Sequence, residues 1–573
     1  MISIDLCYNK ENNVVFKESE VQKMSTIKQF NRTAIKKNHP LLSSIKSIIE
    51  TAFYGNNVVP ISLVSDAYHL ARKSPSVIVT DLPVEGALAL DLPEDAKILV
   101  HNDGAIVGRT AAARRVIGQP GVDEKKYSAL LREAIFEGAK KHFYRGDVVV
   151  GLNENFMVAA HLLVPIGYEA NFYAYLLNFQ PFNAIYQQRY QQSQPYNEND
   201  LYVYCDPDWR HPDYPLGLTL FDPTRNVAAI LGLRYFGELK KATLTLAWAT
   251  AHRNGYLACH GGVKQFQLAN KTYTMATYGL SGSGKSTITL ASHGQKYHVT
   301  VLHDDAFIID QETGATTALE PTYFDKTQDY PMDSEQVKYL LTCQNVGVTL
   351  DENHQKVLVT EDIRNNNGRA MKSRFATPNR VDHLTQSLDA VYWIMKDESL
   401  PPVIRIDDPI LAAVFGATLA TQRSSAENVA DDVDLQALVI EPFANPFRCY
   451  PLAEDYLHFK QLFTKQKTTC YILNTGAFNG YNIPPNVTLE IIEKIIDETA
   501  VFTPFGPVKG LSYSPVPCYQ PDFNSPVYRQ QFITAMKRRL AFIQEMNTKN
   551  NGYDALPEET MVRIQQILLE LTT

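Results

Sequence analysis

The segment GLSGSGKST at residues 279–287 constrains this chain more than any other stretch of its sequence. An apolar run, YTMATYGL, leads into the glycines, and STITLAS continues from them with the start of a helical pattern. The three glycines let the backbone curl so that several N–H groups face one anion at the amino end of a helix. The motif GxxxxGK[ST] between a strand and a helix therefore predicts a phosphate-binding loop. Its residues are Gly279, Leu280, Ser281, Gly282, Ser283, Gly284, Lys285, Ser286 and Thr287.

Charged and polar side chains in and beyond this loop suit a nucleotide with its metal ion. Lys285 offers a point charge for the terminal phosphates, and Ser286 offers a hydroxyl for a metal ion. The segment VTVLHDDAFIID carries Asp304 and Asp305 at the end of an apolar strand, where a P-loop protein needs an acidic metal-holding residue. Adjacent side chains of a strand point to opposite sides, so one carboxylate could face each of two metal ions. The alternatives are a glycine-rich turn without a ligand and a solvated acidic turn.

Composition narrows the class of protein. The chain has 573 residues, which favours two or three domains, and its net charge of −8 gives no support to a general nucleic-acid or membrane-surface binder. No apolar run approaches the roughly 20 residues that cross a bilayer, and the amino terminus lacks the pattern of a signal peptide. The 7 cysteines are scattered singly, which suits a reducing compartment. We therefore expect a cytoplasmic, multi-domain enzyme.

The pattern of secondary structure changes near residues 250–256. Short β-rich runs dominate residues 147–250, whereas strands followed by phosphate-type loops and mixed α/β sequence come later. Apolar spacing in residues 125–144 predicts an amphipathic helix that closes at Gly146. We expect a mixed α/β fold with an amino-terminal domain over residues 1–255 and a carboxy-terminal P-loop domain over residues 256–573.

Two further motifs lie upstream of the loop. RYFGELKK, at residues 234–241, ends with Lys240 and Lys241, and LACHGG, at residues 257–262, contains His260 before two glycines. Taken singly, a lysine pair is usually solvated, and a histidine after an apolar run is usually structural. Combined with the loop and the aspartate pair, they indicate a site with more than one cation.

The ordered set of motifs resembles the ATP-dependent phosphoenolpyruvate carboxykinases. That family has Tyr-x-Gly-Glu-Met-Lys-Lys, Met-His-Cys-Ser-Ala-Asn, Gly-Leu-Ser-Gly-Thr-Gly-Lys-Thr-Thr and Gly-Asp-Asp-Glu-His, in that order. The counterparts here begin at Tyr235, Cys259, Gly279 and His303. The segment 103–116 is similar to the family's substrate loop and places Arg109 at its arginine. The segments 400–420 and 470–480 are similar to its lid region and its Asn-Thr-Gly motif, so the resemblance covers roughly residues 95–500.

The resemblance implies a two-domain fold with the active site in the cleft between the domains and a mobile lid near residues 395–430. The implied reaction converts oxaloacetate and ATP into phosphoenolpyruvate, CO₂ and ADP, in gluconeogenesis or anaplerosis. The implied Mn²⁺ ligands are Lys241, His260 and Asp305, and Ser286 would serve Mg²⁺ with Asp304 acting through water. Lysine ligates a metal only when it is neutral, so burial and the charge of Lys240 should depress the pKa of Lys241.

The remaining implied roles concern the substrate and the transferred phosphoryl group. Arg109 and Tyr235 would hold the dicarboxylate, because a guanidinium fork matches carboxylate geometry. Lys285 and Arg369 would offset charge on the phosphoryl group, although Arg364 and Arg374 compete with Arg369 for that role. Expected partners are ATP or ADP, oxaloacetate or phosphoenolpyruvate, and CO₂, with no nucleic acid or membrane, in a monomer or small homo-oligomer.

Several positions depart from the family pattern. Ser-Ala-Asn after the histidine is replaced by Gly261-Gly262-Val263, and Glu-His after the aspartates by Ala306-Phe307. An arginine on the adenine side corresponds to Ala437, ahead of Glu441-Pro442. The sequence therefore leaves the phosphoryl donor open among ATP, GTP and other donors. Two alternatives also stay open: a P-loop kinase of another acceptor, and a catalytically inactive nucleotide-binding homologue.

Overall fold

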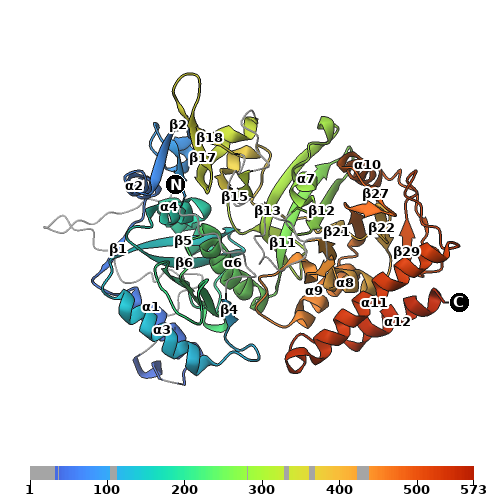
Figure 1. Ribbon diagram of the computed structural model, residues 1–573, viewed down its shortest axis with the longest axis horizontal. Helices are drawn as coiled ribbons and strands as arrows, with labels where there is room; N and C mark the ends of the chain where they lie inside the picture. Colours follow the sequence, from blue (N-terminus) through green and yellow to red (C-terminus); the bar gives the residue numbers. More distant parts are fainter. Residues whose placement is uncertain are drawn as a thin grey trace, which may run out of the picture.

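The computed structural model describes residues 32–36, 38–102, 113–280, 282–327, 334–360, 368–422 and 438–572. Within them the chain forms a mixed α/β fold with three large sheets and twelve α-helices. Figure 1 shows the early strands at one end of the molecule, the carboxy-terminal helices at the other, and β11 and β13 between them. The helices are α1 (Ser44–Ala52), α2 (Val64–Ala71), α3 (Glu124–Gly138), α4 (Glu169–Asn178), α5 (Ala184–Gln192), α6 (Phe236–Arg253), α7 (Lys285–Leu290), α8 (Pro409–Ala417), α9 (Leu452–Lys465), α10 (Pro485–Ile496), α11 (Pro526–Thr548) and α12 (Glu558–Glu570).

An eight-stranded sheet has the order β1-β5-β6-β8-β10-β9-β4, with β7 paired to β5. Alternate residues of its strands enter separate cores: Val203 packs with α4 and α6, whereas Tyr204 packs with α1 and α3. Helices on both faces explain why β6 is buried along its whole length. The strands are β1 (Val58–Pro60), β4 (Ala113–Val116), β5 (Phe143–Asn153), β6 (Phe156–Pro165), β7 (Gln180–Pro181), β8 (Leu201–Asp206), β9 (Leu218–Asp222) and β10 (Val227–Leu231).

A ten-stranded sheet has the order β20-β14-β13-β11-β12-β21-β25-β22-β29-β28. Its strands β12, β21 and β25 run parallel, so their carboxyl ends meet at one edge. β11 pairs antiparallel with β12 and β13 and joins this edge to the middle of the molecule. The strands are β11 (Tyr256–Gln267), β12 (Thr272–Tyr278), β13 (His298–Asp310), β14 (Thr316–Ala318), β20 (His383–Leu384), β21 (Ala390–Met395), β22 (Val403–Ile406), β25 (Thr469–Asn474), β28 (Thr503–Pro504) and β29 (Leu511–Tyr513).

A five-stranded sheet combines segments that are far apart in the sequence. Its order is β15-β19-β16-β3-β2, so strands from both sides of residue 255 pair in one sheet. The strands are β2 (Val77–Pro83), β3 (Lys97–His101), β15 (Tyr323–Lys326), β16 (Leu340–Gln344) and β19 (Arg369–Lys372). Three hairpins complete the fold: β17 (Gly347–Leu350) with β18 (Lys356–Val359), β23 (Ala420–Gln422) with β24 (Leu438–Ile440), and β26 (Ala477–Phe478) with β27 (Tyr481–Asn482).

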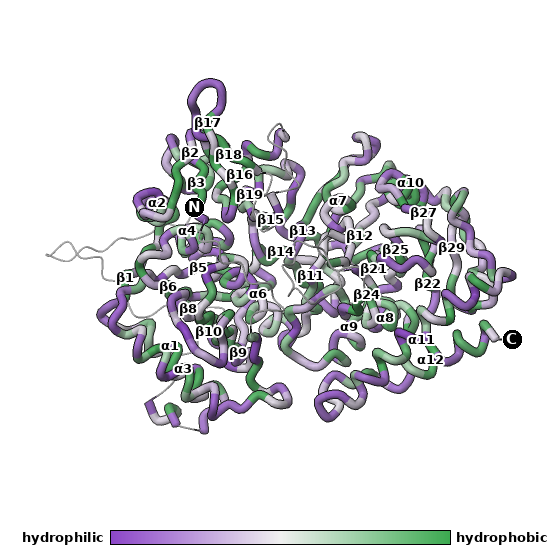
Figure 2. Tube along the Cα trace, viewed as in Figure 1, coloured by the Kyte–Doolittle hydropathy of each residue, from purple (hydrophilic) through white to green (hydrophobic). Residues whose placement is uncertain are grey.

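The distribution of hydropathy agrees with this layering. Figure 2 shows hydrophobic residues along the inner strands and hydrophilic ones in outer turns such as the loop between β17 and β18. Among the helices of the described residues, none combines the length and apolar character that a bilayer crossing requires.

Two expectations from the sequence concern local structure. The helix expected over residues 125–144 ends earlier, because α3 stops at Gly138 and Phe143 begins β5. Aromatic and β-branched residues after position 142 pair with β6 instead of extending the helix. Of the expected lid segment, residues 395–422 form the end of β21, β22, α8 and β23, whereas 423–430 lie outside the described residues. Lid motion and the domain division at residue 255 stay predictions.

A buried histidine in β6 links folding stability to pH. His161 Nδ1 lies 2.6 Å from Asp147 Oδ1, and its Nε2 lies 3.2 Å from Asp200 Oδ2. Burial opposes the charge, but the two carboxylates outweigh it and raise the pKa of His161 to about 9. The histidine pKa in an unfolded chain is about 6.5. The stabilisation is therefore complete below about pH 6.5 and is lost as the pH rises through about 9.

We predict that His161→Gln lowers the melting temperature most at low pH. Because glutamine does not titrate, the gap in melting temperature between wild type and variant should shrink from about pH 6 to about pH 10. Thermal denaturation of both proteins across this range measures the gap. A gap that stays constant would show that His161 is neutral in the folded protein.

Candidate active site

The glycine-rich segment has the predicted strand–loop–helix arrangement, with β12 before it and α7 after it. Gly282 and Gly284 adopt φ values of +81° and +94°, which side chains with a Cβ rarely tolerate. A Cβ on Gly279 would lie 2.3 Å from Ser283 Oγ. Ser286 and Thr287 are exposed at the start of α7, and Ser281 lies outside the described residues. The local backbone therefore requires glycine where the motif has it.

The two aspartates of β13 approach the same lysine. Lys285 Nζ lies 2.9 Å from Asp304 Oδ1 and 4.0 Å from Asp305 Oδ1. The expectation that they point to opposite sides of a regular strand is therefore wrong. Asp305 has φ of +153°, a value that non-glycine residues rarely adopt and that breaks the regular alternation. Lys285 therefore lies near both carboxylates, and their assignment to two separate metal ions stays a prediction.

Asp305 joins three residues from two other elements. Its Oδ2 accepts hydrogen bonds from Lys240 Nζ at 2.8 Å and Lys241 Nζ at 2.7 Å. Its Oδ1 lies 2.8 Å from His260 Nε2. Helix α6 contributes both lysines, and β11 contributes His260, which is opposite Ala306 in the β13 register. The structure thus brings together Lys241, His260 and Asp305, beside Lys285.

The adjacent lysines have opposite pKa shifts. Burial disfavours the charge on Lys240, but Asp305 and Glu320 Oε1, at 3.0 Å, outweigh it and raise the pKa of Lys240. Burial lowers the pKa of Lys241 to about 8, opposed by Asp305 and reinforced by the charge of Lys240. Lys241 Nζ also lies 4.7 Å from the Phe447 ring centroid. Lys240 is thus held as an ammonium, while Lys241 can become neutral near physiological pH.

His260 has a lone pair directed toward the carboxylate. Its Nδ1 lies 2.6 Å from Ala444 O, which can only accept, so Nδ1 carries the proton of the neutral ring. Burial and the charge of Lys241 lower the pKa of His260 to about 4, so the neutral ring prevails at pH 7. Its Nε2 then presents a lone pair to Asp305 Oδ1 at 2.8 Å. A cation between these two acceptors would satisfy both of them.

These donors fit a transition-metal site of mixed nitrogen and oxygen ligands. The donor set comprises two nitrogens and one carboxylate, which manganese accepts, and the carbonyl of Ala444 fixes the tautomer of the imidazole. Across the described ranges, no group of three or more His, Cys, Asp or Glu side chains has the geometry to hold a metal. The cluster around Asp305 contains only two such side chains, His260 and Asp305, because its third member is Lys241.

The structure describes some of the residues that are predicted to bind the substrate or the transferred phosphoryl group. Burial raises the pKa of Tyr235, and the charge of Arg369 in β19 opposes that shift, so the two side chains are neighbours. Arg374 instead forms an ion pair of 2.8 Å with Asp382. The choice between Arg369 and Arg374 for the phosphoryl group stays a prediction. Arg109, Arg364 and Ala437 lie outside the described residues, so their roles stay predictions.

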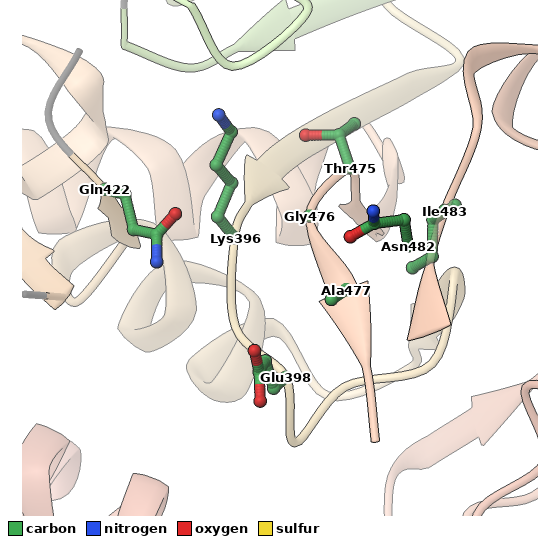
Figure 3. A pocket seen from close by; sticks show the side chains of 8 residues that line it. All are labelled: Lys396, Glu398, Gln422, Thr475, Gly476, Ala477, Asn482 and Ile483. Carbon is green, nitrogen blue, oxygen red and sulfur yellow. The ribbon is translucent and has the colours of Figure 1, made fainter. Parts of the chain in front are cut away.

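A pocket of about 410 Å³ lies beyond the ends of β21 and β25, and Figure 3 shows the side chains that line it. Thr475 Oγ1 donates a hydrogen bond of 2.7 Å to Ser283 O and so joins the pocket wall to the glycine-rich loop. The lining residues are Lys396, Glu398, Gln422, Thr475, Gly476, Ala477, Asn482 and Ile483. The space is therefore adjacent to the predicted phosphate site.

Sequence reasoning missed several residues of this region. Glu320 contacts Lys240 from 15 positions beyond Asp305, and no local pattern marks it. Phe447 flanks Lys241 through tertiary folding, whereas Trp248 lies seven residues further along α6, a spacing that places both on one face of the helix. Thr475 belongs to the segment 470–480, where the family's Asn-Thr-Gly motif could have drawn attention to it.

Comparison with known proteins places the chain in a family. The family model for phosphoenolpyruvate carboxykinase, of the ATP type, matches residues 102–506. The chain therefore belongs to the ATP-type phosphoenolpyruvate carboxykinase family.

Two relatives, both named phosphoenolpyruvate carboxykinase (ATP), are similar at low identity. The protein from Aeropyrum pernix is 25% identical over 301 residues, which cover 50% of this chain and 59% of the relative. The protein from Dictyostelium discoideum is 22% identical over 437 residues, which cover 70% of this chain and 72% of the relative. The match thus spans less than two thirds of the Aeropyrum pernix protein.

The glycines that replace the family's Ser-Ala allow a close approach of β11 to its neighbours. A Cβ on Gly261 would lie 2.5 Å from Thr277 O, and one on Gly262 would lie 2.2 Å from Thr289 Oγ1. Gly262 therefore contacts α7 itself, so this departure from the family motif reflects packing of the helix that follows the glycine-rich loop.

We predict that Gly262→Ala displaces α7 and destabilises the protein by about 1–3 kcal/mol, because the added methyl group overpacks the contact. Denaturant unfolding and MgATP titration should both show the loss. Thr289→Ala removes the two nearest atoms, Oγ1 at 2.2 Å and Cγ2 at 2.8 Å, so the double variant should recover part of the stability. Equal stability of wild type and Gly262→Ala would contradict the packing.

Proposed function

We propose that this chain is an ATP-dependent phosphoenolpyruvate carboxykinase that converts oxaloacetate and ATP into phosphoenolpyruvate, CO₂ and ADP. The convergence of Lys241, His260 and Asp305 beside Lys285 carries the proposal. A plain P-loop kinase needs a metal with its nucleotide, whereas this arrangement adds a second set of cation ligands built from the protein. Membership of the carboxykinase family supports the same reading.

ATP would bind with its phosphates at the glycine-rich loop. Lys285 would neutralise charge on the terminal phosphates, and the exposed hydroxyl of Ser286 would face the Mg²⁺ that accompanies the nucleotide. Asp304 would act on that ion through water, because its Oδ1 already pairs with Lys285 at 2.9 Å. The adjoining 410 Å³ pocket has room for the nucleoside.

Lys241, His260 and Asp305 would hold Mn²⁺. When bound, the ion supplies electrostatic stabilisation for negative charge on the substrate oxygen. Lys240 keeps Asp305 ionised and, through its own charge, favours the neutral form of Lys241. The carbonyl of Ala444 keeps the proton of His260 on Nδ1, which leaves Nε2 available.

Oxaloacetate would be oriented by Arg109 and Tyr235. Cleavage of its bond to the departing carboxylate releases CO₂ and leaves the electron pair as an enolate, whose oxygen then attacks the γ-phosphate of ATP. Lys285 and Arg369 would offset the charge of the transferred phosphoryl group. Phe447 and Trp248, whose rings flank Lys241, would limit the access of water, which would otherwise protonate the enolate.

The proposal extends to the domains, the cellular location and the oligomeric state of the enzyme. It includes a substrate domain over residues 1–255, a nucleotide domain over residues 256–573, a cytoplasmic location and a monomer or small homo-oligomer. The singly scattered cysteines support the cytoplasmic location.

We predict that Lys285→Ala lowers oxaloacetate-dependent ADP formation by about three orders of magnitude or more, because it removes the charge that faces the terminal phosphates. A coupled assay with ATP, GTP and pyrophosphate as alternative donors measures the rate and the donor preference. Lys271→Ala, at an exposed lysine that pairs with Glu498, is the matched control and should retain full activity. Near-full turnover by Lys285→Ala would refute the loop assignment.

We further predict that micromolar Mn²⁺ activates the enzyme strongly at saturating Mg²⁺. His260→Ala should abolish this activation while MgATP binding stays intact, because His260 lies in the separate cluster around Asp305. Titration of activity with Mn²⁺ and calorimetry with MgATP distinguish the two effects. His298→Ala, at an exposed histidine of the neighbouring strand, should respond like wild type. Turnover that Mn²⁺ does not enhance, with His260→Ala fully active, would favour a kinase of another acceptor.

A further inference from the structure

A second buried lysine lies on β11, outside the cluster around Asp305. Lys264 is 1% exposed, and the pairing of β11 with β13 changes register between Val263 and Lys264. Its Nζ donates to Ile288 O at 2.5 Å and lies 3.5 Å from Ala291 O. Both carbonyls belong to the carboxyl end of α7. The unpaired residue of this irregularity, Leu302, lies on β13, so β11 keeps its alternation and Lys264 lies on the same face as Gly262. Its ammonium group therefore contacts the end of the helix opposite to Lys285.

A histidine and a glutamate extend this contact toward the surface. Lys264 Nζ lies 2.8 Å from His293 Nε2, and His293 Nδ1 lies 3.0 Å from Glu493 Oε1 in α10. Lys296 reaches the same glutamate at 3.4 Å from the solvent side. With Nδ1 donating to the carboxylate, Nε2 accepts from the ammonium. Buried Lys264 and His293 and half-buried Glu493 thus form one hydrogen-bonded network between α7 and α10.

The position of this hydrogen-bonded network matters because α7 is short. It has 6 residues, which make about 9 Å of helix at 1.5 Å per residue. A displacement of its last turn therefore also displaces its first turn. The final carbonyls of a helix carry partial negative charge and lack partners within the helix. A buried ammonium at this end is costly unless it is paired. Here the carbonyls, His293 and Glu493 provide the pairing.

We propose that Lys264 is a positioning residue for the phosphate-binding loop, held in place by His293 and Glu493. It fixes the carboxyl end of α7 and thereby sets where Lys285 and Ser286 stand relative to the nucleotide. The proposal rests on the proposed function only in assigning a nucleotide to this loop. Lys264 touches no substrate and acts through α7.

The charge state of Lys264 is sensitive to its surroundings. Burial lowers the pKa of Lys264 to about 7, and Glu493 opposes that shift. Burial and the charge of Lys264 lower the pKa of His293 to about 4, so the imidazole stays neutral. The groups that face Lys264 are the α7 carbonyls, the Phe266 ring on its own strand, His293, and Glu493 with Lys296 behind it.

The first experiment compares Lys264→Met with wild type and with Lys296→Met. Lys296 contacts the same glutamate but is 47% exposed, which makes it a matched control. Calorimetric titration of the full chain with MgATP should show a dissociation constant about ten-fold higher for Lys264→Met, and the KM for ATP should rise more than kcat falls. Lys296→Met should match wild type. Unchanged MgATP affinity in a folded Lys264→Met protein would overturn the proposal.

Hydrogen exchange gives a readout that needs no nucleotide. Amides of residues 285–290 should exchange faster in Lys264→Met than in wild type or Lys296→Met, because α7 loses its fixed carboxyl end. Equal exchange in this segment would also overturn the proposal. Wild-type protein that fails to bind MgATP while α7 still loosens in the variant would refute the proposed function and leave the role of Lys264 in fixing α7 intact.

Glu493→Gln tests the hydrogen-bonded network through a more conservative change. It provides the test if Lys264→Met does not fold. Glutamine can keep the hydrogen bond to His293 but removes the charge that favours the ammonium. MgATP affinity should weaken as the pH rises through about 7 in wild type, and this midpoint should move to lower pH in Glu493→Gln. Ionisation of ATP affects both pH profiles equally, so it does not shift one midpoint relative to the other. Identical pH profiles for wild type and Glu493→Gln would contradict the proposed role of Glu493 in holding Lys264.

Discussion

The carboxylate of Asp305 is the contact on which the rest of the site depends. Two lysines of α6 donate to one of its oxygens, and His260 of β11 faces the other. Burying these charges is costly unless each has a partner, so the site forms only when α6, β11 and β13 are packed together. Glu320 adds a second carboxylate on Lys240. The fold is therefore constrained by charge pairing at its centre as well as by the apolar cores on either side.

Strand β11 connects this charged centre to the glycine-rich loop. His260 lies at Asp305, Gly262 contacts Thr289 of α7, and Lys264 donates to the last turn of the same helix. These three residues occupy alternate positions of one strand, the spacing that places side chains on a common face. A shift of β11 would move the cluster around Asp305 and α7 together. The separation between the two predicted cation sites is thus set by one strand.

Local patterns predicted the strand, loop and helix around residues 279–287, because glycine geometry and apolar spacing are properties of the segment itself. The grouping of Lys241, His260 and Asp305 came from the family resemblance, since no spacing rule brings residues 19 and 45 positions apart to one point. Glu320 and the change of register beside Lys264 depend on tertiary pairing and left no local signal. The helix after residue 124 ended early because strand pairing with β6 prevailed over helical spacing.

The two consecutive lysines, Lys240 and Lys241, have different electrostatic roles. They are adjacent on α6, yet Lys240 contacts two carboxylates and Lys241 contacts one together with aromatic rings. A single lysine would have to neutralise Asp305 and also give up its proton to act as a metal ligand, and these demands oppose each other. With Lys240 held as the ammonium, Asp305 stays ionised after Lys241 loses its proton. The pair therefore permits a neutral amine next to a charged carboxylate, the combination that a cation bound between them requires.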